Sequence, residues 1–184
     1  MSRQILFVQG GGENAHDGWD SKLVESLEQA LGPDYTVRYP RMPDEDDPKF
    51  AAWKAALREE LDQLDDGAIL VGHSMGATIL VHGLAEDPPK RSLAGIFLIS
   101  APFIGEGGWP SEGVAPKPDL GAKLPATTPV FLYQGDADET VSAIHADLYA
   151  KAIPQAVVRK LAGRDHQLNN DLSEVAVDIR NLTQ

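Results

Sequence analysis

Gly72-His73-Ser74-Met75-Gly76 is the stretch that decides the fold of this chain. An apolar run, 68–71, precedes it, and the segment 77–85 after it has the composition of a helix. A strand that turns through G-x-S-x-G into a helix holds its serine in a strained conformation, with the hydroxyl above the sheet. Only small residues two positions before and after the serine leave room for that turn. The pattern predicts that Ser74 is a nucleophile, although the motif alone also fits a Gly-rich turn with an incidental serine.

Short apolar runs alternate with helical patterns along the rest of the chain. Such alternation, with strands that are apolar throughout, predicts an α/β fold in which helices cover both faces of a parallel sheet. In these sheets, functional residues lie beyond the carboxyl ends of the strands, so residues just after each strand are the candidates. The expected strands are 5–8, 36–39, 68–71, 95–100, 130–133 and 156–161, and the expected helices are 19–31, 50–64, 76–85, 141–152 and 172–182.

Composition narrows the function classes. A length of 184 residues with 42% hydrophobic residues predicts one globular domain, 1–184. The net charge of −12 disfavours nucleic acid and anionic membranes as partners. With no cysteine, disulfides and thiolate chemistry are excluded. The first apolar run, 5–8, is too short for a signal peptide, and no run approaches the ~18 residues that span a bilayer, so we expect a cytoplasmic protein.

Two long loops stand out. The first, 41–49, carries Asp44-Glu45-Asp46-Asp47, which is typical of a solvated acidic loop and lacks the spacing of a calcium site. We expect no metal there. The second, 101–128, is rich in Gly and Pro and follows the fourth strand, so it should act as a minimal lid over Ser74. Its apolar side chains could line an acyl site or pack the loop down, and they are Phe103, Ile104 and Trp109.

A serine nucleophile needs a base and an acid that orients the base. His166 follows the sixth strand and is the predicted base, with His16, after the first strand, as the weaker candidate. Asp138 follows the fifth strand and is preferred as the acid over Asp136, which is better placed to cap the turn. The order Ser, acid, His along the chain is that of the α/β-hydrolases.

An acyl-transfer site also needs N–H donors for the oxyanion. One donor should be Met75, directly after the nucleophile. The other should come from the Gly-rich loop after the first strand, with Gly11 preferred and Gly10 next. The same loop could bind phosphate, but it lacks both the G-x-G-x-x-G and the G-K-[ST] patterns.

Taken together, these motifs resemble the α/β-hydrolase superfamily, and within it the compact serine hydrolases of the retinoblastoma-binding-protein type. The likeness covers nearly the whole chain and includes Met42-Pro43 after the second strand and the patterns Gly135-x-x-Asp138 and Gly163-x-x-His166. It implies a three-layer α/β/α sandwich with a six-stranded parallel sheet in the order 2-1-3-4-5-6 and no large cap. It also implies acyl hydrolysis without a cofactor. Gln9 departs from the family, where many members have His before Gly.

The sequence thus predicts a carboxylesterase-like serine hydrolase acting on a small acyl ester by a Ser74-His166-Asp138 triad. A thioesterase or amidase with the same triad is the nearest alternative. A protein-binding module on a weakly active hydrolase fold is the alternative from another class, and a buried Ser74 would favour it.

Overall fold

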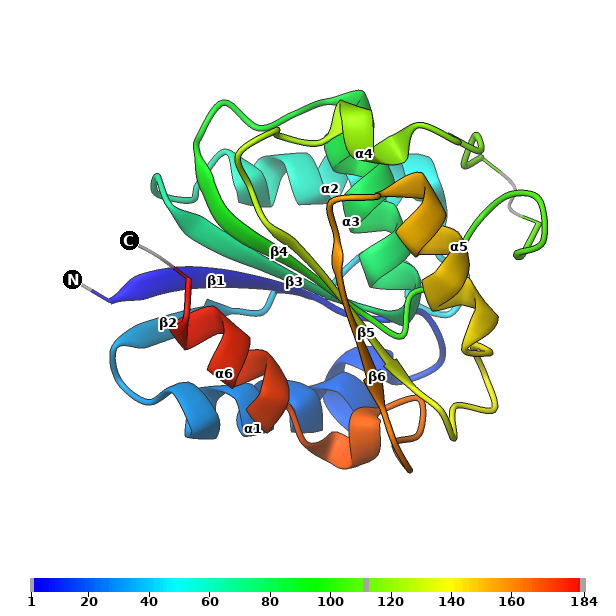
Figure 1. The fold of residues 1–184 in the computed structure, drawn as a ribbon. Helices are drawn as coiled ribbons and strands as arrows, with labels where there is room; N and C mark the ends of the chain where they lie inside the picture. Colours follow the sequence, from blue (N-terminus) through cyan, green and yellow to red (C-terminus); the bar gives the residue numbers. More distant parts are fainter. Residues whose placement is uncertain (1, 111–112, 183–184) are drawn as a thin grey trace.

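The computed structural model describes residues 2–110 and 113–182, and its six strands form one parallel sheet in the order β2-β1-β3-β4-β5-β6 (Figure 1). The predicted strand order is therefore confirmed, and all six expected strands are present within a few residues of their expected bounds. The strands are β1 (Arg3–Val8), β2 (Tyr35–Arg38), β3 (Ala68–His73), β4 (Leu93–Ile99), β5 (Val130–Gly135) and β6 (Val157–Leu161).

Helices lie on both faces of the sheet, which gives the three layers that the sequence predicted (Figure 1). They are α1 (Ser21–Leu31), α2 (Phe50–Leu61), α3 (Ser74–Glu86), α4 (Leu120–Lys123), α5 (Ile144–Ala152) and α6 (Ser173–Arg180). A π-helical turn, η1 (Ala15–Asp20), precedes α1, and a 3-10 turn, η2 (Leu168–Asn170), precedes α6. The π-turn and the short α4 were not predicted.

The alternation of side chains along each strand divides the core into two clusters. In β1, Leu6 and Val8 pack with α2 and α3 on one face, whereas Ile5 and Phe7 pack with α1 and α6 on the other. Both clusters pack against the same sheet. Within the described residues, no helix has the length and apolar character needed to cross a bilayer.

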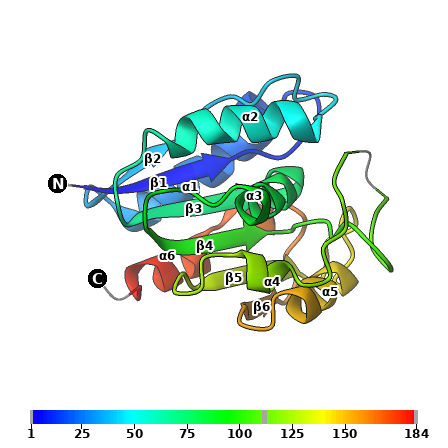
Figure 2. The ribbon, with the colours of Figure 1, turned by 90° about the horizontal axis from the view of Figure 1, so that it is seen from above.

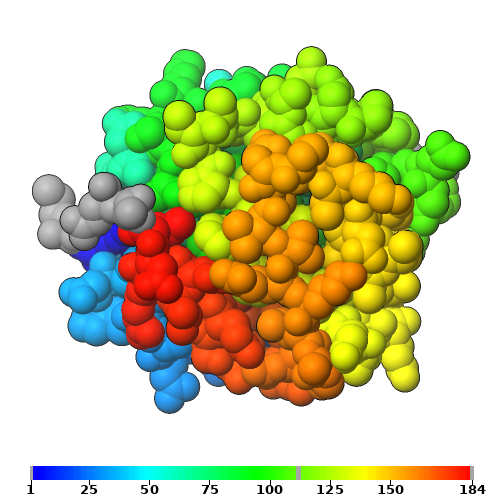
Figure 3. Space-filling model, in the orientation of Figure 1, coloured from blue at the N-terminus to red at the C-terminus, as the bar shows by residue number. Residues whose placement is uncertain are grey.

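The central strands of the sheet are more buried than its edge strand β6. β1, β3 and β4 are paired on both edges and largely buried, whereas β6 pairs only with β5 and is half exposed. The space-filling view of Figure 3 shows β6 and the segment after it at the molecular surface. The described part of the loop 101–128 projects beyond the carboxyl end of the sheet, next to α5 (Figure 2). Residues that follow β1, β3, β5 and β6 meet at this end.

Candidate active site

The turn between β3 and α3 has the predicted strained geometry. Ser74 has a φ of 51°, in the left-handed region that residues with a Cβ rarely adopt. The flanking glycines are required by close backbone approaches. A Cβ on Gly76 would collide with the carbonyl of Gln9, and a Cβ on Gly72 would lie 2.6 Å from the Cα of Ala77. The turn is therefore a nucleophile elbow, and Ser74 is half-buried and reachable from solvent.

The structure brings the three predicted triad residues together from three separate loops. The Oγ of Ser74 lies 3.0 Å from Nε2 of His166, and Nδ1 of His166 lies 2.9 Å from Oδ2 of Asp138. In this chain of hydrogen bonds, Nδ1–H donates to the carboxylate and Nε2 accepts from the hydroxyl. Serine nucleophiles need a base within such hydrogen-bond reach and an acid that orients the base, and this arrangement meets both geometric requirements.

Asp138 is held firmly as a carboxylate. Its Oδ1 accepts from the backbone N–H groups of Thr140 and Val141, at 2.9 and 2.8 Å, and its Oδ2 also accepts from the side-chain amide of Gln134. Burial acts to raise the pKa of Asp138, but the hydrogen bonds from His166 and Val141 outweigh it, so the pKa is lowered. Asp136, the competing candidate, accepts from the N–H of Gly163 at 2.6 Å and caps that turn.

Among the other histidines, none of the recorded hydrogen bonds in the described residues reaches Ser74. His16 faces away, with Nδ1 bonded to Asp17 and Nε2 to the carbonyl of Tyr39, on whose ring it stacks. His145 accepts the N–H of Phe103 at Nδ1. These contacts argue against His16 as the base.

The predicted oxyanion donors differ in whether their N–H groups already have acceptors. Met75 is the second residue of α3, where a helix leaves its N–H groups without intrahelical acceptors. Gly11 has no acceptor for its N–H in the part of the chain that the structure describes. The N–H of Gly10, by contrast, donates to Oδ2 of Asp20 at 2.6 Å, so it is already committed. Gly10 is therefore corrected from a donor to a spacer: a Cβ there would lie 3.2 Å from the Cβ of Ser74.

The acidic loop after β2 fixes the Gly-rich loop after β1. The buried amide of Gln9 donates to Oε2 of Glu45 at 2.6 Å and accepts the N–H of Met42 at 3.0 Å. Glu45 also accepts the N–H of His16, and its carbonyl accepts the N–H of Gly12. The loop is thus more than a solvated surface, because Glu45 anchors the backbone on which Gly11 lies. The departure at Gln9 has this structural role.

The three apolar residues predicted to line an acyl site separate in the structure. Ile104 is 2% exposed and Phe103 is 9% exposed, and both belong to the core cluster beneath α3. Phe103 also borders a cavity of about 380 Å³ with Leu148 and Pro116, and no triad residue lines that cavity. Ile104 is therefore a packing residue in this structure. Trp109 is 37% exposed, with its ring edge-to-face on His145.

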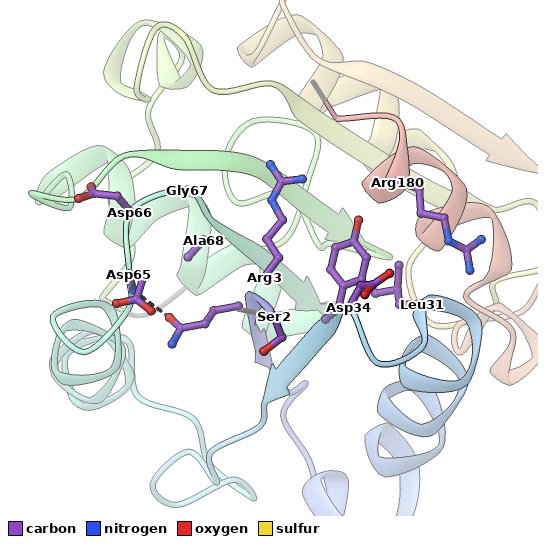
Figure 4. Close-up of a pocket in the computed structure, with 11 residues that line it drawn as sticks. Ser2, Arg3, Leu31, Asp34, Asp65, Asp66, Gly67, Ala68 and Arg180 are labelled. Atoms are coloured by element: carbon purple, nitrogen blue, oxygen red, sulfur yellow. Dashed lines mark hydrogen bonds between the residues drawn. The ribbon is translucent and has the colours of Figure 1, made fainter. Parts of the chain in front are cut away.

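A cavity of about 820 Å³ lies at the opposite end of the sheet from Ser74. Its walls come from the first residues of β1, β2 and β3, with Asp34, Asp65 and Arg180 around them (Figure 4). It holds no nucleophile paired with a base. Cavity size therefore does not locate the reactive groups of this protein.

A second His–Asp pair lies directly under the elbow and was missed by the sequence analysis. Nδ1 of His73 lies 2.9 Å from Oδ1 and 3.0 Å from Oδ2 of Asp20, and both side chains are almost fully buried. The ring of His73 is 4.9 Å from that of His166, centroid to centroid. No sequence signal distinguishes Asp20 from its acidic neighbours.

Comparison with known proteins places the fold. A sequence model described as the alpha/beta hydrolase family matches residues 5–179. A comparison with curated proteins finds no match. An esterase from Rhodococcus sp. is 17% identical with a TM-score of 0.76, over 99% of this chain and 92% of the other.

Two further solved structures share the fold. A serine hydrolase without a lid from Xanthomonas campestris is 18% identical with a TM-score of 0.62, over 98% of this chain and 81% of the other. An N-formylmaleamic acid deformylase from Pseudomonas putida is 13% identical with a TM-score of 0.68, over 97% of this chain and 91% of the other.

Proposed function

Because this chain belongs to the alpha/beta hydrolase family, we propose that it is a serine hydrolase that cleaves carboxylic esters through an acyl-enzyme. One observation carries the proposal: an unbroken chain of hydrogen bonds from Ser74 through His166 to Asp138, with heavy-atom distances of 3.0 and 2.9 Å. That geometry is within the reach required for proton transfer from a nucleophile to its base.

In the proposed first step, Oγ of Ser74 attacks the acyl carbonyl and its proton passes to Nε2 of His166. The N–H groups of Met75 and Gly11 receive the oxyanion, and the imidazolium is stabilised by Asp138. The bond to the alcohol then breaks, and His166 returns the proton to the departing oxygen. Water, deprotonated by His166, releases the acid from Ser74 by the same steps in reverse order.

The same triad would act on thioesters or amides, and the presence of a deformylase among the structural neighbours is a reason to include amides in any substrate panel. The half-exposed state of Ser74 argues against a binding module with an unreactive serine. With Ile104 and most of Phe103 packed into the core, we propose a shallow site for small acyl groups, with Trp109 at its margin. We retain a cytoplasmic location, with no nucleic-acid or membrane partner, as part of the proposal.

Labelling with a fluorophosphonate probe tests the proposal directly. Intact mass and peptide mapping should find one adduct, on Ser74, and Ser74→Ala should abolish it. Ser142→Ala, which removes an exposed hydroxyl far along the chain, should label like wild type. Absence of labelling in the folded wild-type protein would overturn the proposal, whereas labelling would justify a panel of esters, thioesters and amides.

A further inference from the structure

The ring of His73 meets a hydrogen-bond acceptor at each nitrogen. Nδ1 faces the carboxylate of Asp20, and Nε2 lies 3.0 Å from the backbone carbonyl of His166. A carbonyl oxygen can only accept, so Nε2 must carry a proton. The protonation of Nδ1 then decides whether the ring is neutral or an imidazolium.

The surroundings of Asp20 favour a charged pair. Its Oδ2 accepts the N–H of Gly10 at 2.6 Å, and its Oδ1 has a longer contact, at 3.5 Å, with the amide of Gln167. A carboxylate with donors at both oxygens is stabilised in its ionised form. Burial opposes charge on both partners, yet their mutual attraction and hydrogen bonds lower the pKa of Asp20 and raise that of His73.

The pair joins the Gly-rich loop, the elbow and the loop that carries His166. Asp20 holds the Gly-rich loop through the N–H of Gly10. His73 is the residue before the predicted nucleophile, and it holds the backbone of His166. Asp20 reaches this position because the π-turn η1 ends on it, turning its side chain inward while Trp19 next to it stays 56% exposed. π-helical turns of this kind are frequent at functional sites.

We propose that Asp20 and His73 form a buried carboxylate–imidazolium pair that positions the Gly11 donor and the His166 base relative to Ser74. The inference rests on the proposed hydrolase function. Both are positioning residues, because neither touches the reacting atoms in the recorded contacts.

The carboxylate of Asp20 also shields His166 from the positive charge of His73. A lone imidazolium 4.9 Å from the ring of His166 would oppose the positive charge that His166 gains when it takes the serine proton. Asp20 cancels that charge at a distance of 2.9 Å. The titratable groups that face His73 are Asp20 from η1, His166 from the loop after β6 and, farther away, Asp138 after β5.

The protonation state of His73 can be read without any substrate. Long-range 1H–15N spectra of the wild-type protein, with the His73 ring assigned by its loss in His73→Gln, should show protons on both ring nitrogens at pH 8. An unprotonated Nδ1 at that pH would overturn the charged pair. This measurement does not depend on whether the protein is an esterase.

The positioning role is tested by the rate of fluorophosphonate labelling. Asp20→Asn retains an acceptor for Gly10 but cannot hold the imidazolium. The resulting displacement of the Gly11 donor and the His166 base should slow labelling on the order of 10- to 100-fold. Asp17→Asn is the matched control, since it changes an exposed aspartate of the same π-turn and should label like wild type. Thermal melting establishes that each variant is folded.

The outcomes separate the two proposals. A wild-type protein that is not labelled contradicts the hydrolase function itself. A wild-type protein that is labelled, with folded Asp20→Asn labelled at the same rate, contradicts the positioning role alone. Slow labelling of Asp20→Asn, together with loss of the Nδ1 proton of His73 in that variant, is the expected result.

Discussion

The two His–Asp pairs at the carboxyl end of the sheet differ in what the far nitrogen of each ring meets. In both pairs, Nδ1 lies 2.9 Å from an aspartate oxygen. Nε2 of His166 meets the hydroxyl of Ser74, which has a proton to give, whereas Nε2 of His73 meets a carbonyl, which has none. Nε2 of His166 can therefore take up a proton from its partner, whereas Nε2 of His73 can only donate a hydrogen bond to its partner.

The two histidines also differ in their access to solvent. The side chain of His166 is 18% exposed, and that of His73 is 2% exposed. A base that exchanges protons with substrate and water needs an open edge, whereas a positioning group gains from burial because its interactions strengthen as water is excluded. These differences fit the two roles that we propose for the pairs.

The largest expected effect comes from removing the charge of Asp138 in its pair with His166. Asp138→Asn should lower kcat/KM for a short activated ester by about 10⁴-fold, because an amide no longer fixes the Nδ1–H form of His166 or stabilises its imidazolium. Steady-state kinetics measure this. Asp136→Asn, which only loosens the cap on Gly163, should stay within a few-fold of wild type. Equal losses in the two variants would remove the distinction between these carboxylates.

Breaking the buried pair of Asp20 and His73 should lower the free energy of unfolding. His73→Gln leaves Asp20 buried without its counter-ion, which typically costs about 3–5 kcal/mol of unfolding free energy. The raised pKa of His73 means that the pair stabilises the fold fully below pH 6.5 and loses this contribution as the pH rises through the folded value. The lowered pKa of Asp20 means that the contribution also disappears as the pH falls below about 3.8.

Urea unfolding of wild type and His73→Gln, at pH 5.5 and at pH 10, measures this difference. The destabilisation should be larger at pH 5.5. A difference in unfolding free energy that does not change with pH would contradict an ion pair and indicate a neutral hydrogen bond.

Another buried histidine sharpens the comparison because, among the described residues, its ring has no hydrogen-bond partner. His82 lies in α3, 1% exposed, and neither ring nitrogen has a hydrogen-bond partner in the described residues. Burial, helped by the charge of Lys117, lowers its pKa from 6.5 to about 4. Stability should therefore fall as the pH drops from 6.5 toward 4, by up to ~3 kcal/mol, since only the unfolded chain takes up the proton.

His82→Leu removes this titration and should flatten the acid side of the stability curve. Unfolding free energies between pH 4 and 8 provide the measurement. Parallel curves for wild type and His82→Leu would show that the acid sensitivity arises elsewhere.

Much of the fold could be predicted because local patterns report it. Continuous apolar runs in β1 and β3 predict strands buried on both faces, and Gly72 and Gly76 predict the elbow from steric needs that the structure meets. The elbow motif selected Ser74, and the rule that sites follow the carboxyl ends of strands narrowed its partners to a few residues that included Asp138 and His166, which the structure brings together. Their catalytic roles stay a prediction until the labelling experiment is done.

Other features depend on contacts between distant segments. The pairing of Gln9 with Glu45 spans 36 residues, and that of Asp20 with His73 spans 53. Gly10 was a reasonable candidate oxyanion donor because it lies in the Gly-rich loop. Its N–H donates instead to the carboxylate of Asp20, whose position depends on the π-turn. Likewise, Ile104 could have faced a substrate, and only packing beneath α3 shows that it is core.

By itself, the sequence determined the strand order expected from the family likeness, the strained serine turn and the order of the reactive groups along the chain. The strand order is what the family resemblance implies, whereas the serine turn and the order of the candidate residues follow from glycine sterics and chain connectivity, which are local properties. Only the tertiary structure decided which carboxylate faces which imidazole, and which ring nitrogen meets a donor or an acceptor. Those facts depend on side-chain direction at distances of about 3 Å, and such directions are set by packing among elements that the sequence brings together from far apart.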